Sequence, residues 1–85
     1  MMRMLKLKNA RMYDYPGTET DLIIHGSMGD IMDLTEDISE NQNEIEFEGG
    51  TYYVTKMEVR QSKDDRLTGT LGLAVTPLDN LYSIG

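Results

Sequence analysis

The chain has 85 residues, a formal net charge of −7 and no cysteine. A chain of this length forms one small domain, here residues 1–85, and the lack of cysteine excludes a disulfide and a thiolate metal site and fits a reducing compartment. No apolar run reaches about 18 residues, and charges interrupt the N-terminal end, so neither a membrane span nor a signal peptide is expected. We therefore expect a cytoplasmic protein or, for a viral chain, one in the host cytoplasm or the virion.

The N-terminal part alternates apolar and basic residues. Residues 5–8 read Leu-Lys-Leu-Lys, the period-two pattern of a strand with one buried face. We expect a basic first strand over about residues 3–13. Pro16 and Gly17 then indicate a turn, because proline fixes φ and glycine tolerates the positive φ of many turns. A second strand is predicted over residues 20–25.

Residues 28–40 change from strand spacing to helix spacing. Their apolar side chains recur every three or four positions, at Met28, Ile31, Leu34 and Ile38, as on one face of a helix. Ser27 can cap the helix and Asp30 suits its positive end, whereas Gly29 opposes a helix by about 1 kcal/mol. We predict one short helix over residues 28–40; the alternative is an acidic loop with a single helical turn.

A hairpin is predicted around Gly49 and Gly50. Before the glycines, Ile45 and Phe47 alternate with glutamates, and a Gly-Gly pair supplies the positive φ values of a tight turn. A two-residue loop at these glycines would place the cross-strand pairs Phe47 with Tyr52 and Ile45 with Val54.

Beyond the turn the apolar pattern changes face between Val54 and Met57. A β-bulge near Thr55 would produce this change, because it inserts one unpaired residue into a strand. A three-residue loop over residues 49–51 would also produce it, by shifting the register of the whole strand. The sequence leaves these two alternatives open.

The C-terminal part has the clearest strand pattern. One face of the predicted strand carries Leu67, Leu71, Leu73 and Val75, and the other carries Thr68, Thr70 and Thr76. Gly69 and Gly72 interrupt the pattern, which indicates strong curvature or a close approach of two backbones. Pro77 ends the strand.

Together these elements predict a mainly β fold. Four or five antiparallel strands and one short helix around residues 28–40 would form a small curved sheet or barrel, similar in scale to an SH3 or OB domain. Closing the sheet removes unpaired edges, which favours a barrel in so short a chain. An open α+β roll with the helix on one face is the second interpretation.

The sequence lacks the patterns of catalytic and metal sites. His25 is the only histidine, and spacing places no nucleophile beside it; a single histidine is usually structural. The acids between Asp30 and Asp37 do not have the alternating spacing of an EF-hand loop, and Gly49-Gly50 is not followed by the Gly-Lys of a phosphate-binding loop. We therefore expect no enzyme, no metal site and no cofactor.

Charge is distributed unevenly along the chain. The first eleven residues carry four basic groups and no acid, whereas residues 12–55 carry eleven acids and no lysine or arginine. The candidate partner-binding residues are the acids of the middle part: Asp30, Asp33, Glu36, Asp37, Glu40, Glu44, Glu46 and Glu48. They form either a solvated face that keeps a small domain soluble or a surface for a basic partner.

These features favour a small acidic protein-interaction or assembly module, such as a subunit of a larger phage-type particle. Its partner would be a protein with a basic surface, or a second copy bound through the basic first strand. The alternative is an acidic inhibitor that imitates DNA and occupies the basic site of a nucleic-acid-handling enzyme. Direct binding to nucleic acid or to an anionic membrane is not expected, because both depend on cationic groups.

Overall fold

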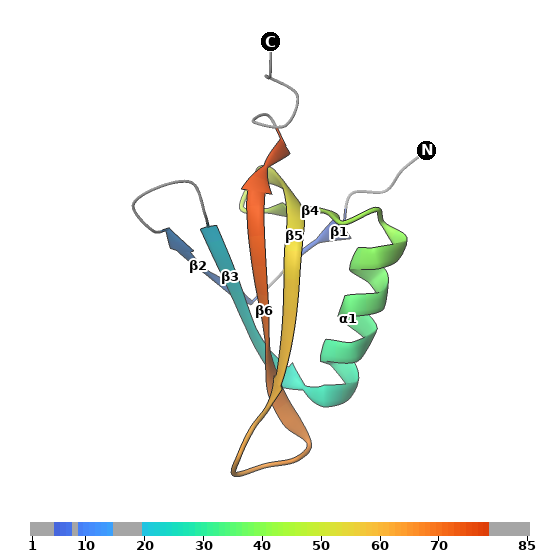
Figure 1. Cartoon of the computed structure of the whole chain (residues 1–85), viewed down its shortest axis with the longest axis vertical. Coiled ribbons are helices and arrows are strands. Elements are labelled where there is room, and N and C mark those ends of the chain that lie inside the picture. The colour runs from blue at the N-terminus through green and yellow to red at the C-terminus, as the bar shows by residue number, and fades with distance from the viewer. Residues whose placement is uncertain (1–4, 8, 15–19, 79–85) are drawn as a thin grey trace.

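The computed structural model describes residues 5–7, 9–14 and 20–78. The described part contains one helix and one curled sheet that forms a half-barrel, which confirms the predicted small curved sheet with a short helix (Figure 1). The elements are β1 (Leu5–Lys6), β2 (Ala10–Asp14), β3 (Thr20–Ser27), α1 (Met28–Glu40), β4 (Glu44–Phe47), β5 (Gly50–Gln61) and β6 (Thr68–Pro77). The six strands lie in the order β1-β4-β5-β6-β3-β2. The β1–β4 pair is parallel and the other pairs are antiparallel.

The predicted first strand over residues 3–13 is wrong, because the chain divides into β1 and β2 at opposite edges of the sheet. The N–H of Leu7 donates to the carbonyl oxygen of Glu46 at 2.9 Å, and the Leu7 side chain enters the core. Asn9 then has φ of 60°, a left-handed conformation that asparagine tolerates better than most residues. Lys6 and Arg11 therefore do not share one strand.

The helix prediction is confirmed with its boundaries. α1 begins after Ser27, whose Oγ accepts a hydrogen bond of 3.1 Å from the N–H of Asp30. Ile31 and Ile38 are buried and hold the helix against the sheet. We call the face of the sheet that carries the core side chains and contacts α1 the inner face, and the opposite face the outer face.

The turn between β4 and β5 lies one residue earlier than predicted. It consists of Glu48 and Gly49, with φ of 49° and 81°, the two positive values that a tight hairpin needs. The cross-strand pairs are Glu44 with Tyr53, Ile45 with Tyr52, Glu46 with Thr51 and Phe47 with Gly50. Both predicted registers are therefore wrong.

The predicted β-bulge near Thr55 is present. Val54 pairs with Val75, Lys56 pairs with Ala74, and the register shifts between them. Thr55 is therefore the extra residue, and the strand changes face as a bulge requires. Val54 stays in the core, and Lys56 is exposed.

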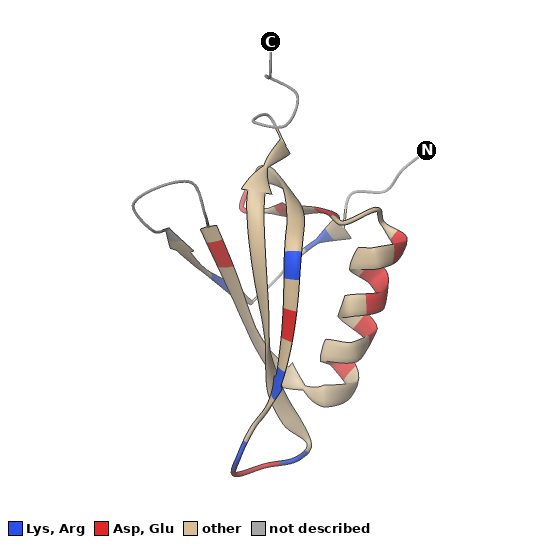
Figure 2. Ribbon diagram, viewed as in Figure 1, with Lys and Arg blue, Asp and Glu red and all other residues tan. Residues whose placement is uncertain are grey.

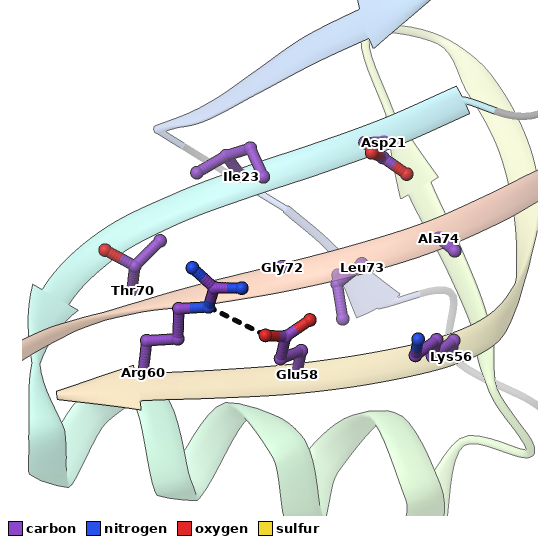
Figure 3. Close-up of a pocket in the computed structure, with 9 residues that line it drawn as sticks. All are labelled: Asp21, Ile23, Lys56, Glu58, Arg60, Thr70, Gly72, Leu73 and Ala74. Atoms are coloured by element: carbon purple, nitrogen blue, oxygen red, sulfur yellow. Dashed lines mark hydrogen bonds and ion pairs between the residues drawn. The ribbon is translucent and has the colours of Figure 1, made fainter.

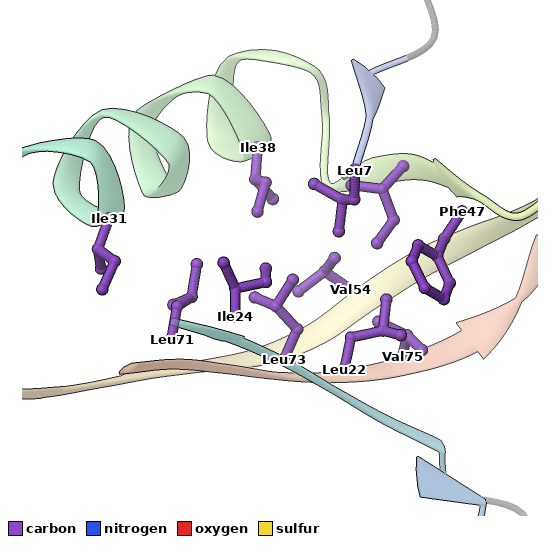
Figure 4. Close-up of a cluster of buried hydrophobic side chains, with 11 residues drawn as sticks. Leu7, Leu22, Ile24, Ile31, Ile38, Phe47, Val54, Leu71, Leu73 and Val75 are labelled. Atoms are coloured by element: carbon purple, nitrogen blue, oxygen red, sulfur yellow. The ribbon is translucent and has the colours of Figure 1, made fainter. Parts of the chain in front are cut away.

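Eleven buried side chains from α1 and all strands or strand ends except β2 form the core (Figure 4): Leu7, Leu22, Ile24, Ile31, Ile38, Ile45, Phe47, Val54, Leu71, Leu73 and Val75. Leu67 was predicted to share a strand face with Leu71, Leu73 and Val75, but it precedes β6 and is 77% exposed. Gly69 confirms the predicted close approach, because a Cβ there would collide with the carbonyl oxygen of Arg60 and with the Met28 side chain.

Candidate interaction surfaces

The five acids of α1 are all exposed: Asp30, Asp33, Glu36, Asp37 and Glu40. Because Ile31 and Ile38 fix which side of the helix is buried, the acids lie on its solvent side (Figure 2). The helix contains no lysine or arginine, and within the described part of the chain none of its carboxylates forms an ion pair. We call these five residues the acidic stripe.

The three remaining candidates, Glu44, Glu46 and Glu48, belong to β4 and its turn, so the structure divides the predicted set into two groups. Glu44 and Glu46 are half-buried and Glu48 is exposed. An oxygen of Glu46 lies 3.5 Å from the Nζ of Lys6 on the neighbouring strand. This partial compensation was not visible in the sequence, because Lys6 reaches Glu46 through a parallel pairing of strands far apart in the chain.

A second surface lies on the outer face, where a groove follows β6. It has a volume of about 370 Å³ and is lined by Asp21, Ile23, Lys56, Glu58, Arg60, Thr70, Gly72, Leu73 and Ala74 (Figure 3). The outward residues of β6 between the two neighbouring strands are small, namely Thr70, Gly72 and Ala74. Longer side chains on β3 and β5 therefore form the walls.

The charges of the groove alternate along β5, where Lys56, Glu58 and Arg60 share the outer face. The Nε of Arg60 donates a hydrogen bond of 2.7 Å to Oε1 of Glu58. This hydrogen bond and the charge of Arg60 lower the pKa of the Glu58 carboxyl below its ordinary value. Asp21 faces them from β3. The groove thus combines an ion pair, one further cation and one further acid.

This groove was not predicted from the sequence. Two signals point toward it: alternate charged residues on β5 and small residues at alternate positions of β6. Their meaning depends on knowing that β6 lies between β3 and β5. Strand order is set by long-range pairing, so the two signals could not be joined from the sequence.

His25 lies on the outer face as well, with its Nδ1 3.1 Å from the hydroxyl oxygen of Thr70 and joined to it by a hydrogen bond. Across the described residues, no group of three or more His, Asp or Glu side chains is placed to hold a metal ion. In that same part of the chain, no helix has both the length and the apolar character needed to cross a membrane.

Compared with protein-family models, curated proteins and solved structures, the chain matches none of them. What it can bind therefore follows from its own charges and shape. Among the described residues, the acidic stripe and the groove on the outer face are distinguished by their charge and shape, and they lie on opposite sides of the sheet.

Proposed function

We propose that the chain is a small non-enzymatic interaction or assembly module whose acidic stripe binds a basic surface on a protein partner. The supporting observation is the acidic stripe itself, five exposed carboxylates on one helix with no cation on that helix. Like charges three or four residues apart destabilise a helix by a few tenths of a kcal/mol per pair, roughly. A basic partner would relieve this repulsion and would be drawn to the surface from a distance.

The acidic charge also narrows the class of partner. Phosphates of nucleic acid and anionic lipid headgroups would be repelled by the stripe, so the partner is a protein. We place the interaction in the cytoplasm, either as part of a larger assembly such as a phage-type particle or, for a viral chain, within the host or virion.

The second candidate is an inhibitor that imitates DNA. It is favoured by the regular succession of carboxylates along α1 without an intervening cation, which resembles the run of like charges along a nucleic-acid strand. Competition distinguishes the two candidates. Duplex DNA displaces an inhibitor of a nucleic-acid-handling enzyme from its target, and it does not displace an assembly partner that has no nucleic-acid site.

The main proposal is tested by association kinetics with the partner that the immobilised chain captures from lysate. Replacing Asp33→Asn and Glu36→Gln neutralises two stripe carboxylates. The matched control, Asp64→Asn with Asp65→Asn, removes the same charge from the exposed β5–β6 connection. Association should slow for the stripe variant at low salt, while the control variant should resemble the wild type.

Salt provides the internal check. The Debye length falls to about 3 Å at 1 M salt, so the difference between wild type and stripe variant should shrink as salt is added. Equal association rates for the wild type and the stripe variant at low salt would contradict the proposal and would assign the acidic stripe to solubility alone.

A further inference from the structure

The two surfaces differ in charge and lie on opposite sides of the sheet. The acidic stripe carries five carboxylates and no cation, whereas the groove on the outer face carries two cations, Lys56 and Arg60, beside two acids, Asp21 and Glu58. Arg11 adds a third cation to the outer face, since it is exposed on β2 and lies opposite Ile23 of the groove. Each molecule therefore presents an acidic surface on one side and its Lys- and Arg-bearing sheet surface on the other.

We propose that the groove binds α1 of a second copy of this chain, so that copies join head to tail. This inference rests on the proposed function, because it uses the acidic stripe as the recognition surface and names its partner. The stripe of one molecule would lie along β6 of the next and face the cations of β5.

A helix would lie over the groove and rest on its walls. Adjacent strands lie about 4.8 Å apart, so the backbones of β3 and β5, which flank β6, are separated by roughly 10 Å. A helix with its side chains is about 10–12 Å wide and therefore spans the groove from wall to wall. The small outward side chains of β6 permit a close approach: Gly72 has none, and the position its Cβ would occupy has Ile23 Cδ1 as its nearest neighbour, at 3.7 Å.

The spacing of the charges also agrees. Lys56 and Arg60 are four residues apart on a strand, or about 13 Å. Asp33 and Glu40 are seven residues apart on a helix, or about 10 Å. A helix lying beside β5 can therefore offer one end of its stripe to each cation.

The acids inside the groove set the position of the bound helix. Glu58 is already compensated by Arg60, and a guanidinium has five N–H donors, so the terminal nitrogens of Arg60 remain able to bind a carboxylate. Asp21, on the β3 wall, has no ion pair with any residue in the described ranges. The acidic stripe of the second copy should therefore lie nearer β5 than β3.

This contact is heterologous, since the stripe and the groove lie on opposite sides of the sheet and cannot both face the same neighbour. Heterologous contacts leave one free stripe and one free groove on every assembly until a ring closes. The wild-type chain should therefore form a series of oligomers. A variant that lacks one of the two surfaces can still bind through the other, and it should stop the assembly from growing at that end.

Two variants separate the surfaces. The groove variant carries Lys56→Gln and Arg60→Gln, and for this experiment the stripe variant is extended from Asp33→Asn and Glu36→Gln by two further changes, Asp37→Asn and Glu40→Gln. The groove control, Lys63→Gln with Arg66→Gln, makes the same charge change in the exposed β5–β6 connection. Circular dichroism and thermal melting establish that each variant is folded before its mass is measured by sedimentation velocity and light scattering.

At low salt the wild type and the groove control should exceed the mass of a monomer, and their mass should fall as salt is added. Each surface variant alone should be monomeric. Mixing the two variants should give a heterodimer of one groove variant and one stripe variant, because the intact stripe of the first fits the intact groove of the second. A symmetric contact would not be restored by mixing.

Three outcomes would overturn the inference: a wild type that stays monomeric to roughly 1 mM at low salt, corresponding to about −4 kcal/mol of binding; association that survives in the groove variant; or a mixture that remains monomeric. None of these affects binding of a captured basic partner through the stripe, so the proposed function would stand. Conversely, if a captured partner associates with the wild type and the stripe variant at the same rate, the proposed function is contradicted, whatever the result of the self-association experiment.

Discussion

The hydroxyl of Thr55 donates a hydrogen bond of 3.1 Å to the carbonyl oxygen of Ala74. Thr55 is the extra residue of the bulge in β5, and this bond joins it to β6 where the regular pairing is interrupted. The bulge directs Lys56 to the groove and Met57, which packs against the core, to the inner face. One residue thus determines which side of the sheet receives the charges of β5.

Deleting Thr55 should therefore leave the two faces of β5 unchanged. Without the extra residue, Val54 and Lys56 become neighbours in a regular strand that still pairs with Val75 and Ala74, so Lys56 stays on the outer face and Met57 on the inner face. Thr55→Val removes one hydrogen bond and should cost about 0.5–1.5 kcal/mol. Urea denaturation followed by circular dichroism measures both variants. A deletion variant that no longer unfolds cooperatively would contradict the assignment of Thr55 as the unpaired residue.

Phe47 should be a major contributor to stability. It is 6% exposed and belongs to the core cluster, so Phe47→Ala should lower the free energy of unfolding by about 3–5 kcal/mol. Leu67→Ala is the matched control, because Leu67 is a large apolar residue that is 77% exposed. Its denaturation midpoint should stay near that of the wild type. A Phe47→Ala midpoint equally close to the wild type would show that Phe47 is not a core residue.

Gly69 and Gly72 lie on the same strand and should respond oppositely to a methyl group. Gly69→Ala would press a Cβ against the carbonyl oxygen of Arg60 and the Met28 side chain, so the start of α1 or the β5 backbone must shift. Overpacking of this kind costs typically about 1–3 kcal/mol. Gly72→Ala meets only ordinary contacts, the nearest at 3.7 Å, and should be neutral or slightly stabilising. Thermal unfolding of the two variants side by side provides the comparison.

The ion pair in the groove predicts a pH dependence. The hydrogen bond and charge of Arg60 lower the folded-state pKa of Glu58, so the pair favours folding at pH values above the ordinary carboxyl pKa. That contribution is lost as the pH falls through the lowered pKa and Glu58 becomes protonated. Both side chains are exposed, so the effect on stability should be small.

The pKa itself is therefore the better readout. Arg60→Gln should raise the pKa of Glu58 toward its ordinary value, as followed by NMR titration of the side-chain carboxyl carbon. Arg66→Gln, which removes a cation from the β5–β6 connection, serves as the control and should leave that titration unchanged. An unchanged Glu58 titration in Arg60→Gln would show that the pair does not persist in solution.

Local patterns predicted the elements that local interactions determine. The boundaries of α1 follow from the spacing of its apolar residues and from the cap at Ser27, which bonds only three residues ahead. The bulge was one of two alternatives, and it was recognisable because the apolar pattern of β5 changes face within three residues, between Val54 and Met57.

Features that depend on distant contacts were missed. The β4–β5 turn has its two positive φ values at Glu48 and Gly49, whereas the preference of glycine for such values favoured Gly49 and Gly50. The division of the N-terminal segment depends on Leu7, whose N–H binds a carbonyl in β4. Predicting the groove would have required knowing that β6 lies between β3 and β5. A single sequence contains no direct signal of such long-range pairings.

The strand order has a consequence for how the chain folds. The β4–β5 and β5–β6 pairs join neighbours in sequence, whereas the β3–β6 pair brings Ile24 opposite Leu71 and encloses α1, β4 and β5 between them. Closing so long a segment carries an entropic cost that the hairpins avoid. The β4–β5–β6 meander is therefore expected to form first, and β3 to dock on it with α1 already at its end. Substitutions in β3 should then mainly accelerate unfolding, and those in the β5–β6 hairpin should mainly slow folding.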